Sequence, residues 1–219
     1  LNLLIVPIVI LFGFMGSGQE FMPFLEVGLG EGTRGIVLLV MLGIHGALTG
    51  LNQIASTAIS REGRLFWLSK TIPVPAKIQL RAKLIYSVLF ASAQLSVLVA
   101  VALIFFKFTL ADLLALVVLG VLVSVPVSAI CLLNDLFRPK LNWSEPQQAM
   151  KGNWQTMIAA LFSWSYLAII GVLLKFLLGM GLSYSLLYVI GGFLLAASSL
   201  LLVRWMDAAA QGQYSSLLD

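Results

Sequence analysis

Polar side chains within the apolar part of the chain are the first candidates for chemistry, because such groups need a partner in hydrocarbon. Several recur at helical spacing in one apolar run and form a polar stripe: His45, Thr49, Asn52, Gln53 and Ser56. The stripe could bond a neighbouring helix, or it could line a path for a polar solute. We favour helix bonding, since the single His45 does not make a proton relay.

Two glycines stand beside this polar stripe. Gly46 and Gly50 are four residues apart and would share a face of a helix. Small residues at this spacing let two helix backbones approach closely inside a membrane. The pattern therefore predicts a tight helix–helix contact along the stripe.

The second set of candidates lies in two polar segments between apolar runs. Charged and aromatic groups, with one glycine, are gathered there and could bind a partner: Arg61, Glu62, Gly63, Arg64, Trp67, Lys70, Asp135, Arg138, Lys140 and Trp143. Taken singly, the cations and rings are also what any membrane interface collects. An ordinary elbow between two spans is therefore the simpler reading of the first segment.

Residue types for catalysis or metal binding are lacking. The sequence has no G-x-x-x-x-G-K-[ST] phosphate loop and no H-E-x-x-H motif, and it holds one His and one Cys. It also has no D-D-x-x-D pair that could hold Mg²⁺ and a diphosphate. We predict no enzyme activity on this chain and no cofactor or metal site.

The composition is that of an integral membrane protein. Hydrophobic residues make up 60% of the 219 residues and charged residues only 10%, and the mean hydropathy is +1.03. A soluble domain carries about a quarter charged residues. The net charge of +4 is therefore no indication of nucleic-acid binding.

The apolar runs predict an all-α, polytopic transmembrane bundle that occupies residues 1–219 as a single domain. A helix needs about 20 apolar residues to cross the hydrocarbon core. About six runs qualify, the first of them short: 1–15, 35–59, 84–106, 110–133, 156–178 and 184–206. Leu1 is not an initiator Met and lies inside an apolar stretch, so we expect a fragment or a processed chain.

The distribution of cations predicts the orientation. Ten of the thirteen Lys and Arg residues fall in or beside the loops 60–83 and 134–155 or at the end of the last span. Only Arg34, Lys107 and Lys175 fall on the other side. The positive-inside rule places both loops and the C-terminus in the cytoplasm.

The first of these loops predicts a short interfacial helix from Ser60 to Pro73. Ser60 would cap its start, and Pro73 would end it. Apolar side chains follow one face, with two rings beside them that would anchor in the headgroup region: Leu65, Leu68 and Ile72, with Phe66 and Trp67.

The two polar segments resemble those of bacterial ABC-2-type transport permeases. The segments are S-R-E-G-R-L-F-W-L-S-K-T-I-P-V-P at 60–75 and N-D-L-F-R-P-K-L-N-W-S-E-P at 134–146, followed by Lys151 and Asn153. In that family the same two patterns follow two different spans in this order. The resemblance covers residues 35–154 well and the remainder only by hydropathy.

The resemblance implies a permease subunit in a bacterial plasma membrane, paired with a separate ATP-binding cassette ATPase and a second permease domain or copy. We expect it to be an exporter. The helix after the second span would be a coupling helix that contacts the ATPase. Members of the family are usually longer, so this chain would be a C-terminal half. A non-transporting scaffold or sensor subunit is the alternative, and the transported substrate is not indicated.

Overall fold

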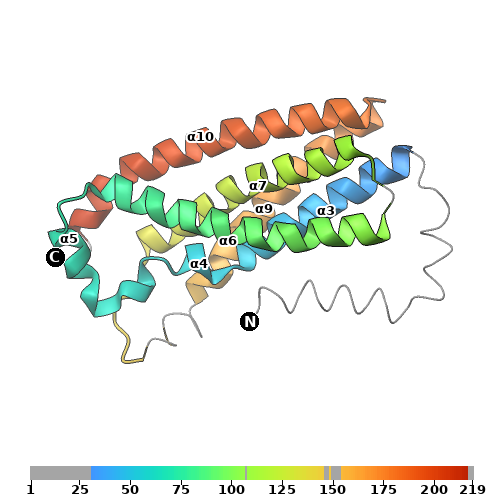
Figure 1. Ribbon diagram of the computed structural model, residues 1–219. Coiled ribbons are helices and arrows are strands. Elements are labelled where there is room, and N and C mark those ends of the chain that lie inside the picture. Colours follow the sequence, from blue (N-terminus) through green and yellow to red (C-terminus); the bar gives the residue numbers. More distant parts are fainter. Residues whose placement is uncertain (1–30, 107, 146–147, 149–153, 217–219) are drawn as a thin grey trace.

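The computed structural model describes residues 31–106, 108–145, 148 and 154–216. In this part of the chain all regular structure is helical, and the long helices run side by side as one bundle (Figure 1). These long helices are α3 (Glu31–Leu51), α6 (Ala76–Phe105), α7 (Leu110–Phe137), α9 (Trp154–Gly179) and α10 (Tyr184–Ser216). Three short elements, α4 (Gln53–Ser56), η1 (Ser60–Leu65) and α5 (Phe66–Thr71), connect α3 to α6 at one end of the bundle.

Five helical segments are long and apolar enough to cross a membrane. The predicted class, an all-α bundle of membrane-spanning helices, agrees with this part of the chain. The predicted first span, 1–15, lies outside the described residues, as does most of 146–153 in the predicted loop 134–155.

The central helix of the bundle is α7. It packs against α3, α6, α9 and α10. In the most apolar 18 residues of α7, 67% of the residues are buried inside the protein, compared with 17% in the corresponding stretch of α9. The outer helices therefore turn most of their apolar surface away from the protein, as lipid-facing spans do. Two apolar clusters fill the bundle, and side chains of α7 belong to both.

We call η1 and α5 together the elbow, and the end of the bundle that carries them the elbow end. At this end the helices extend further than the predicted spans. Helix α6 begins at Ala76, eight residues before the predicted start at Leu84. Its 30 residues correspond to about 45 Å, longer than a hydrocarbon core of about 30 Å. Hydropathy detects only the part of a helix that suits lipid, so the polar first turns of α6 have the sequence pattern of a loop.

The same effect lengthens α7 and α10. Helix α7 continues to Phe137 rather than to Leu133, which places Asp135 on the helix and not in a loop. Helix α10 runs to Ser216, ten residues past the predicted end of the last span at Met206. The extensions of α6 and α7 carry polar groups that join the elbow to the bundle.

Candidate functional site

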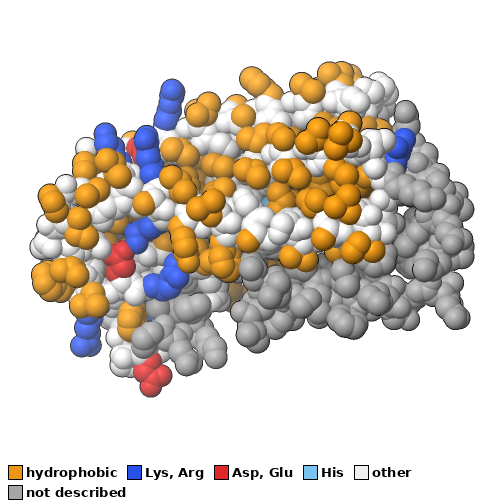
Figure 2. Space-filling view, in the orientation of Figure 1, with side chains coloured by type: hydrophobic (Ala, Val, Ile, Leu, Met, Phe, Trp, Pro, Cys, Tyr) orange, Lys and Arg blue, Asp and Glu red, His pale blue; other side chains and the backbone are white. Residues whose placement is uncertain are grey.

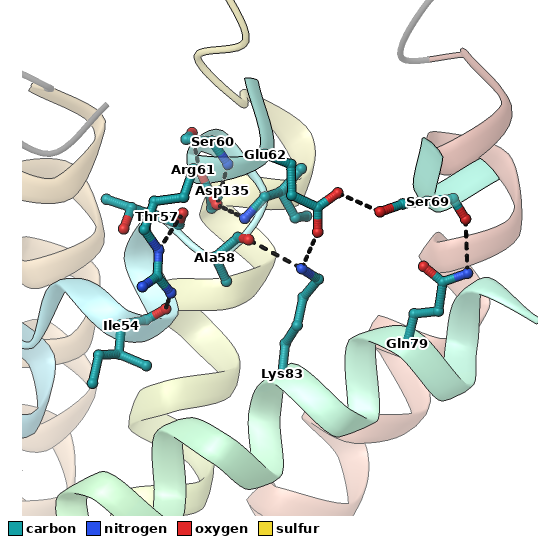
Figure 3. A network of polar contacts seen from close by, with 11 residues as sticks. Ile54, Thr57, Ala58, Ser60, Arg61, Glu62, Ser69, Gln79, Lys83 and Asp135 are labelled. Atoms are coloured by element: carbon teal, nitrogen blue, oxygen red, sulfur yellow. Dashed lines mark hydrogen bonds and ion pairs between the residues drawn. The ribbon is translucent and has the colours of Figure 1, made fainter. Parts of the chain in front are cut away.

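The two polar segments meet at a buried carboxylate, that of Asp135. Its Oδ2 accepts hydrogen bonds from the backbone N–H of Ile59 at 2.6 Å and from that of Ser60 at 3.0 Å, and its Oδ1 accepts one from the Ser60 hydroxyl (Figure 3). The Asp135 side chain is fully buried. A buried carboxylate needs such donors, because an unpaired charge in a low-dielectric interior is very costly.

Ser60 extends this contact into the chain that follows α7. Its hydroxyl oxygen accepts a hydrogen bond from the backbone N–H of Lys140 at 2.9 Å, and its carbonyl accepts one from the indole N–H of Trp143 at 2.8 Å. We call Ile59, Ser60, Asp135, Lys140 and Trp143 the Asp135 junction. It joins the polar segment before α6 to the segment after α7.

A glycine makes room for the Trp143 ring. Gly63 has φ +52°, a backbone conformation that favours glycine, and a Cβ built there would lie 2.4 Å from Cζ2 of Trp143. Both the backbone angle and the ring contact therefore require glycine at this position. Gly63 is buried, so its contribution is to the turn itself.

A second polar contact holds the elbow against α6. Lys83 forms an ion pair with Glu62 and also donates to the carbonyl of Ala58 at 3.1 Å (Figure 3). Ser69 on α5 donates to the other oxygen of Glu62 at 2.7 Å. Gln79 then donates to the carbonyl of Ser69 at 3.0 Å. Glu62 thus connects η1, α5 and α6 at once.

The predicted helix Ser60–Pro73 is wrong in two respects. Ser60 does not cap a helix, since its N–H and hydroxyl are taken by Asp135, a partner distant in sequence. The segment is also not one helix: a 3₁₀ helix with a left-handed turn at Gly63 precedes the α-helix α5. The local pattern of a helix cap was real, but a long-range contact competed for the same groups.

The two predicted anchor rings have different environments. Phe66 is fully buried, with its ring centroid 5.0 Å from that of Tyr214 on α10, so its predicted role as a ring anchored in lipid headgroups is wrong. Trp67 is 52% exposed. It belongs to an exposed apolar strip on the elbow, formed by Leu65, Trp67, Leu68 and Ile72.

Cations lie at the same end of the bundle as this apolar strip. Figure 2 shows Lys and Arg side chains gathered at the elbow end of the face in view, with hydrophobic side chains between them. Arg64 and Lys70 are exposed on the elbow. Arg34 and Lys175 lie near the opposite end of the bundle. The elbow thus presents a basic and apolar surface.

The remaining predicted contact residues divide between internal bonds and exposure. Arg61 donates to the carbonyls of Thr57 at 3.2 Å and Ile54 at 2.9 Å, at the C-terminal end of α4. The ammonium of Lys140 donates to the carbonyl of Gln148 at 3.1 Å. Arg138, the residue that follows α7, is exposed.

The first two residues of the polar stripe, His45 and Thr49, lie where α3 packs against α7. His45 is buried on α3, and its Nε2 lies 2.9 Å from the Ser124 hydroxyl and 3.2 Å from the Gly120 carbonyl, both on α7. Thr49 is also buried, and its hydroxyl donates to the carbonyl of His45 one turn earlier at 2.8 Å. These contacts are those of a stripe that bonds two helices together.

The other three residues of the stripe, Asn52, Gln53 and Ser56, lie at a break in the second predicted span. Asn52 is not helical, and its side-chain oxygen accepts a hydrogen bond from the N–H of Ile54 at 3.0 Å, which caps the short helix α4. Gln53 begins α4, and Ser56, its last residue, is buried. The predicted continuous span 35–59 is therefore interrupted at Asn52.

The glycine pair allows the close approach predicted for it. A Cβ at Gly50 would lie 3.0 Å from Cβ of Ser163 on α9, and one at Gly46 would lie 3.0 Å from a methyl of Leu167. Ser163 also lies 3.3 Å from the thiol of Cys131 on α7. Sequence reasoning did not single out Ser163, because one serine in an apolar run has no partner visible in the pattern.

Sequence reasoning also missed the roles of Lys83 and Tyr214. In the sequence, Lys83 contributes only a positive charge to the orientation, and Tyr214 follows the predicted end of the last span at Met206. A hydropathy pattern does not show which distant side chains meet. No cluster of potential metal ligands occurs among the described residues. Comparison with known protein families, curated proteins and solved structures gives no match for this chain.

Proposed function

We propose that this chain is the membrane-spanning permease subunit of an ATP-binding cassette transporter of the ABC-2 type. A separate ATPase subunit would bind and hydrolyse ATP, and a second permease domain or copy would complete the path through a bacterial plasma membrane. The proposed direction of transport is export. The proposal involves no nucleic acid and no chemistry on this chain.

The observation that carries the proposal is the Asp135 junction. The two segments that resemble the permease family come from different loops, and the junction joins them through a buried carboxylate. A coupling element must be stiff enough to move helices when its partner moves. Hydrogen bonds from α7 and an ion pair from α6 give the elbow that stiffness.

The exposed surface of the elbow is suited to binding a partner protein on that side of the membrane. Its exposed groups are Arg64, Trp67 and Lys70, together with the apolar side chains beside Trp67. Trp and Arg are the residues that most often dominate protein interfaces. The positive-inside rule places this end of the bundle in the cytoplasm, where an ATPase subunit would be found.

Within the proposal, six of the candidates form two groups with different roles. Arg64, Trp67 and Lys70 would contact the ATPase. Asp135, Glu62 and Gly63 would act inside this chain and transmit the movement to α6 and α7, because they are buried or paired there. The polar stripe would hold α3 on α7 while the elbow moves.

The test is co-expression of the chain with candidate ATP-binding cassette ATPases from the same organism, followed by purification and assay in lipid nanodiscs. We expect the two to co-purify and the lipid-embedded complex to hydrolyse ATP faster than the ATPase alone. Trp67→Ala should lower this stimulation, whereas Leu89→Ala, an exposed position in the α6 span, should not. Absence of both co-purification and stimulation would favour the scaffold or sensor alternative.

A further inference from the structure

A lateral groove between α7, α9 and α10 has the features of a lipid site. It encloses about 510 Å³, within the usual range of about 300–1,000 Å³ for small-molecule sites. Its apolar wall includes Ile130 and Leu133 of α7, Ile158 and Phe162 of α9, and Trp205 of α10. The groove is therefore open between three spans, where acyl chains are the surrounding solvent.

The polar end of the groove lies where α7 ends. Arg138 directly follows the last residue of α7 and lines the groove together with Asn134. The Asn134 amide donates to the carbonyl of Gln155 at 2.9 Å and so joins α7 to α9 at this level. The groove thus has a polar end at the limit of the span and an apolar wall along it.

The charge of Arg138 has no acidic partner within the described chain. The ion pairs found there involve Arg34, Arg81 and Lys83. An exposed guanidinium at the limit of a span suits a phosphate, which it can bind through two parallel hydrogen bonds. Basic pockets between spans are known sites for anionic headgroups.

Two aromatic rings mark the same level of the membrane. The rings of Phe137 on α7 and Trp205 on α10 have centroids 6.0 Å apart, and both residues line the groove. Aromatic side chains collect where the headgroups meet the acyl chains. A molecule that places its phosphate at Arg138 would place its chain past these rings, along Ile158 and Phe162.

We infer that this groove binds one anionic phospholipid, with its phosphate at Arg138 and an acyl chain between α7, α9 and α10. The cation selects the anionic headgroup, and the apolar wall selects a chain rather than a soluble phosphate. The site does not depend on the proposed transport function, because it requires only the bundle in a membrane. A bound lipid would hold the end of α7, and thus Asp135, against α9.

The experiment measures lipid selectivity with spin-labelled lipids in bilayers that contain the full chain. Phosphatidylglycerol and phosphatidylcholine with the same labelled acyl chain are compared by the fraction whose motion is restricted by the protein. We expect an excess association of phosphatidylglycerol that falls about fivefold in Arg138→Gln, the effect of about one cation near a membrane surface. Arg138→Lys should keep most of the excess.

The matched control is Arg204→Gln. Arg204 is another exposed cation near the same end of the bundle, but it does not line the groove, so its removal should leave the excess in place. Ile158→Trp, which fills the apolar wall, should lower the restricted fraction of both lipids. The inference is overturned if the parent shows no preference, or if Arg138→Gln and Arg204→Gln reduce it equally. The first result would show that the groove does not select an anionic lipid. The second would show that the preference comes from the general positive charge of the surface and not from the groove.

Discussion

The carboxylate of Asp135 binds both the backbone N–H and the hydroxyl of Ser60, a residue 75 positions earlier in the chain. This relationship fixes the start of the elbow to the end of the central helix. Since α7 contacts every other long helix, a displacement of the elbow reaches the whole bundle through one side chain.

Asp135→Asn should destabilise the protein, because an amide cannot accept three hydrogen bonds as well as a carboxylate does. We expect a loss of about 2–3 kcal/mol, comparable to a hydrogen bond that involves a charged group. Thermal unfolding in detergent measures this. The control is Asp207→Asn, whose partner Arg81 is largely exposed, so the expected loss is clearly smaller. Equal losses in the two variants would contradict the role given to Asp135.

The pair Glu62 and Lys83 predicts a rescue experiment. Glu62→Lys places two cations together and should release the elbow from α6, seen as faster proteolysis within residues 64–72. Adding Lys83→Glu restores opposite charges and should recover most of the protection, since residues in contact couple by about 0.5–3 kcal/mol. Strictly additive effects of the two substitutions would show that the pair does not hold the elbow.

Gly63→Ala tests the turn against the Trp143 ring. A residue with a Cβ held at this sparsely populated combination of backbone angles costs about 1–3 kcal/mol, and the ring must also move. The expected result is a lower unfolding temperature. Gly212→Ala is the control, because nothing lies within 4 Å of a Cβ there and alanine favours a helix. If both substitutions are tolerated alike, the ring contact is unimportant.

The orientation is tested with single cysteines and an impermeant thiol reagent on intact cells. Ser183→Cys, between α9 and α10, should react, whereas Gln148→Cys, at the elbow end, should react only after the cells are opened. Native Cys131 is buried and should give little background. Labelling of Gln148→Cys in intact cells would reverse the orientation and place the elbow outside.

The sequence predicted the helical class and the approximate spans because burial in lipid demands long apolar helices, and this demand is visible in composition. It also predicted the close helix contact at Gly50, because two small residues four positions apart in a span let another helix approach closely. The position of Asp135 could not be predicted, because its donors are the backbone of Ile59 and Ser60 and any sequence supplies a backbone. The burial of Phe66 could not be predicted either, because its ring packs against Tyr214, which follows the predicted end of the last span.

The most direct test of the proposed function is site-specific photo-crosslinking in cells, with the photoreactive residue placed at position 67. Trp67 is exposed at the elbow, so the account predicts a crosslinked adduct that mass spectrometry identifies as an ATP-binding cassette ATPase. The same residue at position 89, exposed within the α6 span, should give no such adduct. If position 67 crosslinks only to lipid, or to a protein without an ATP-binding cassette, while the chain is correctly inserted, the elbow is not a coupling element.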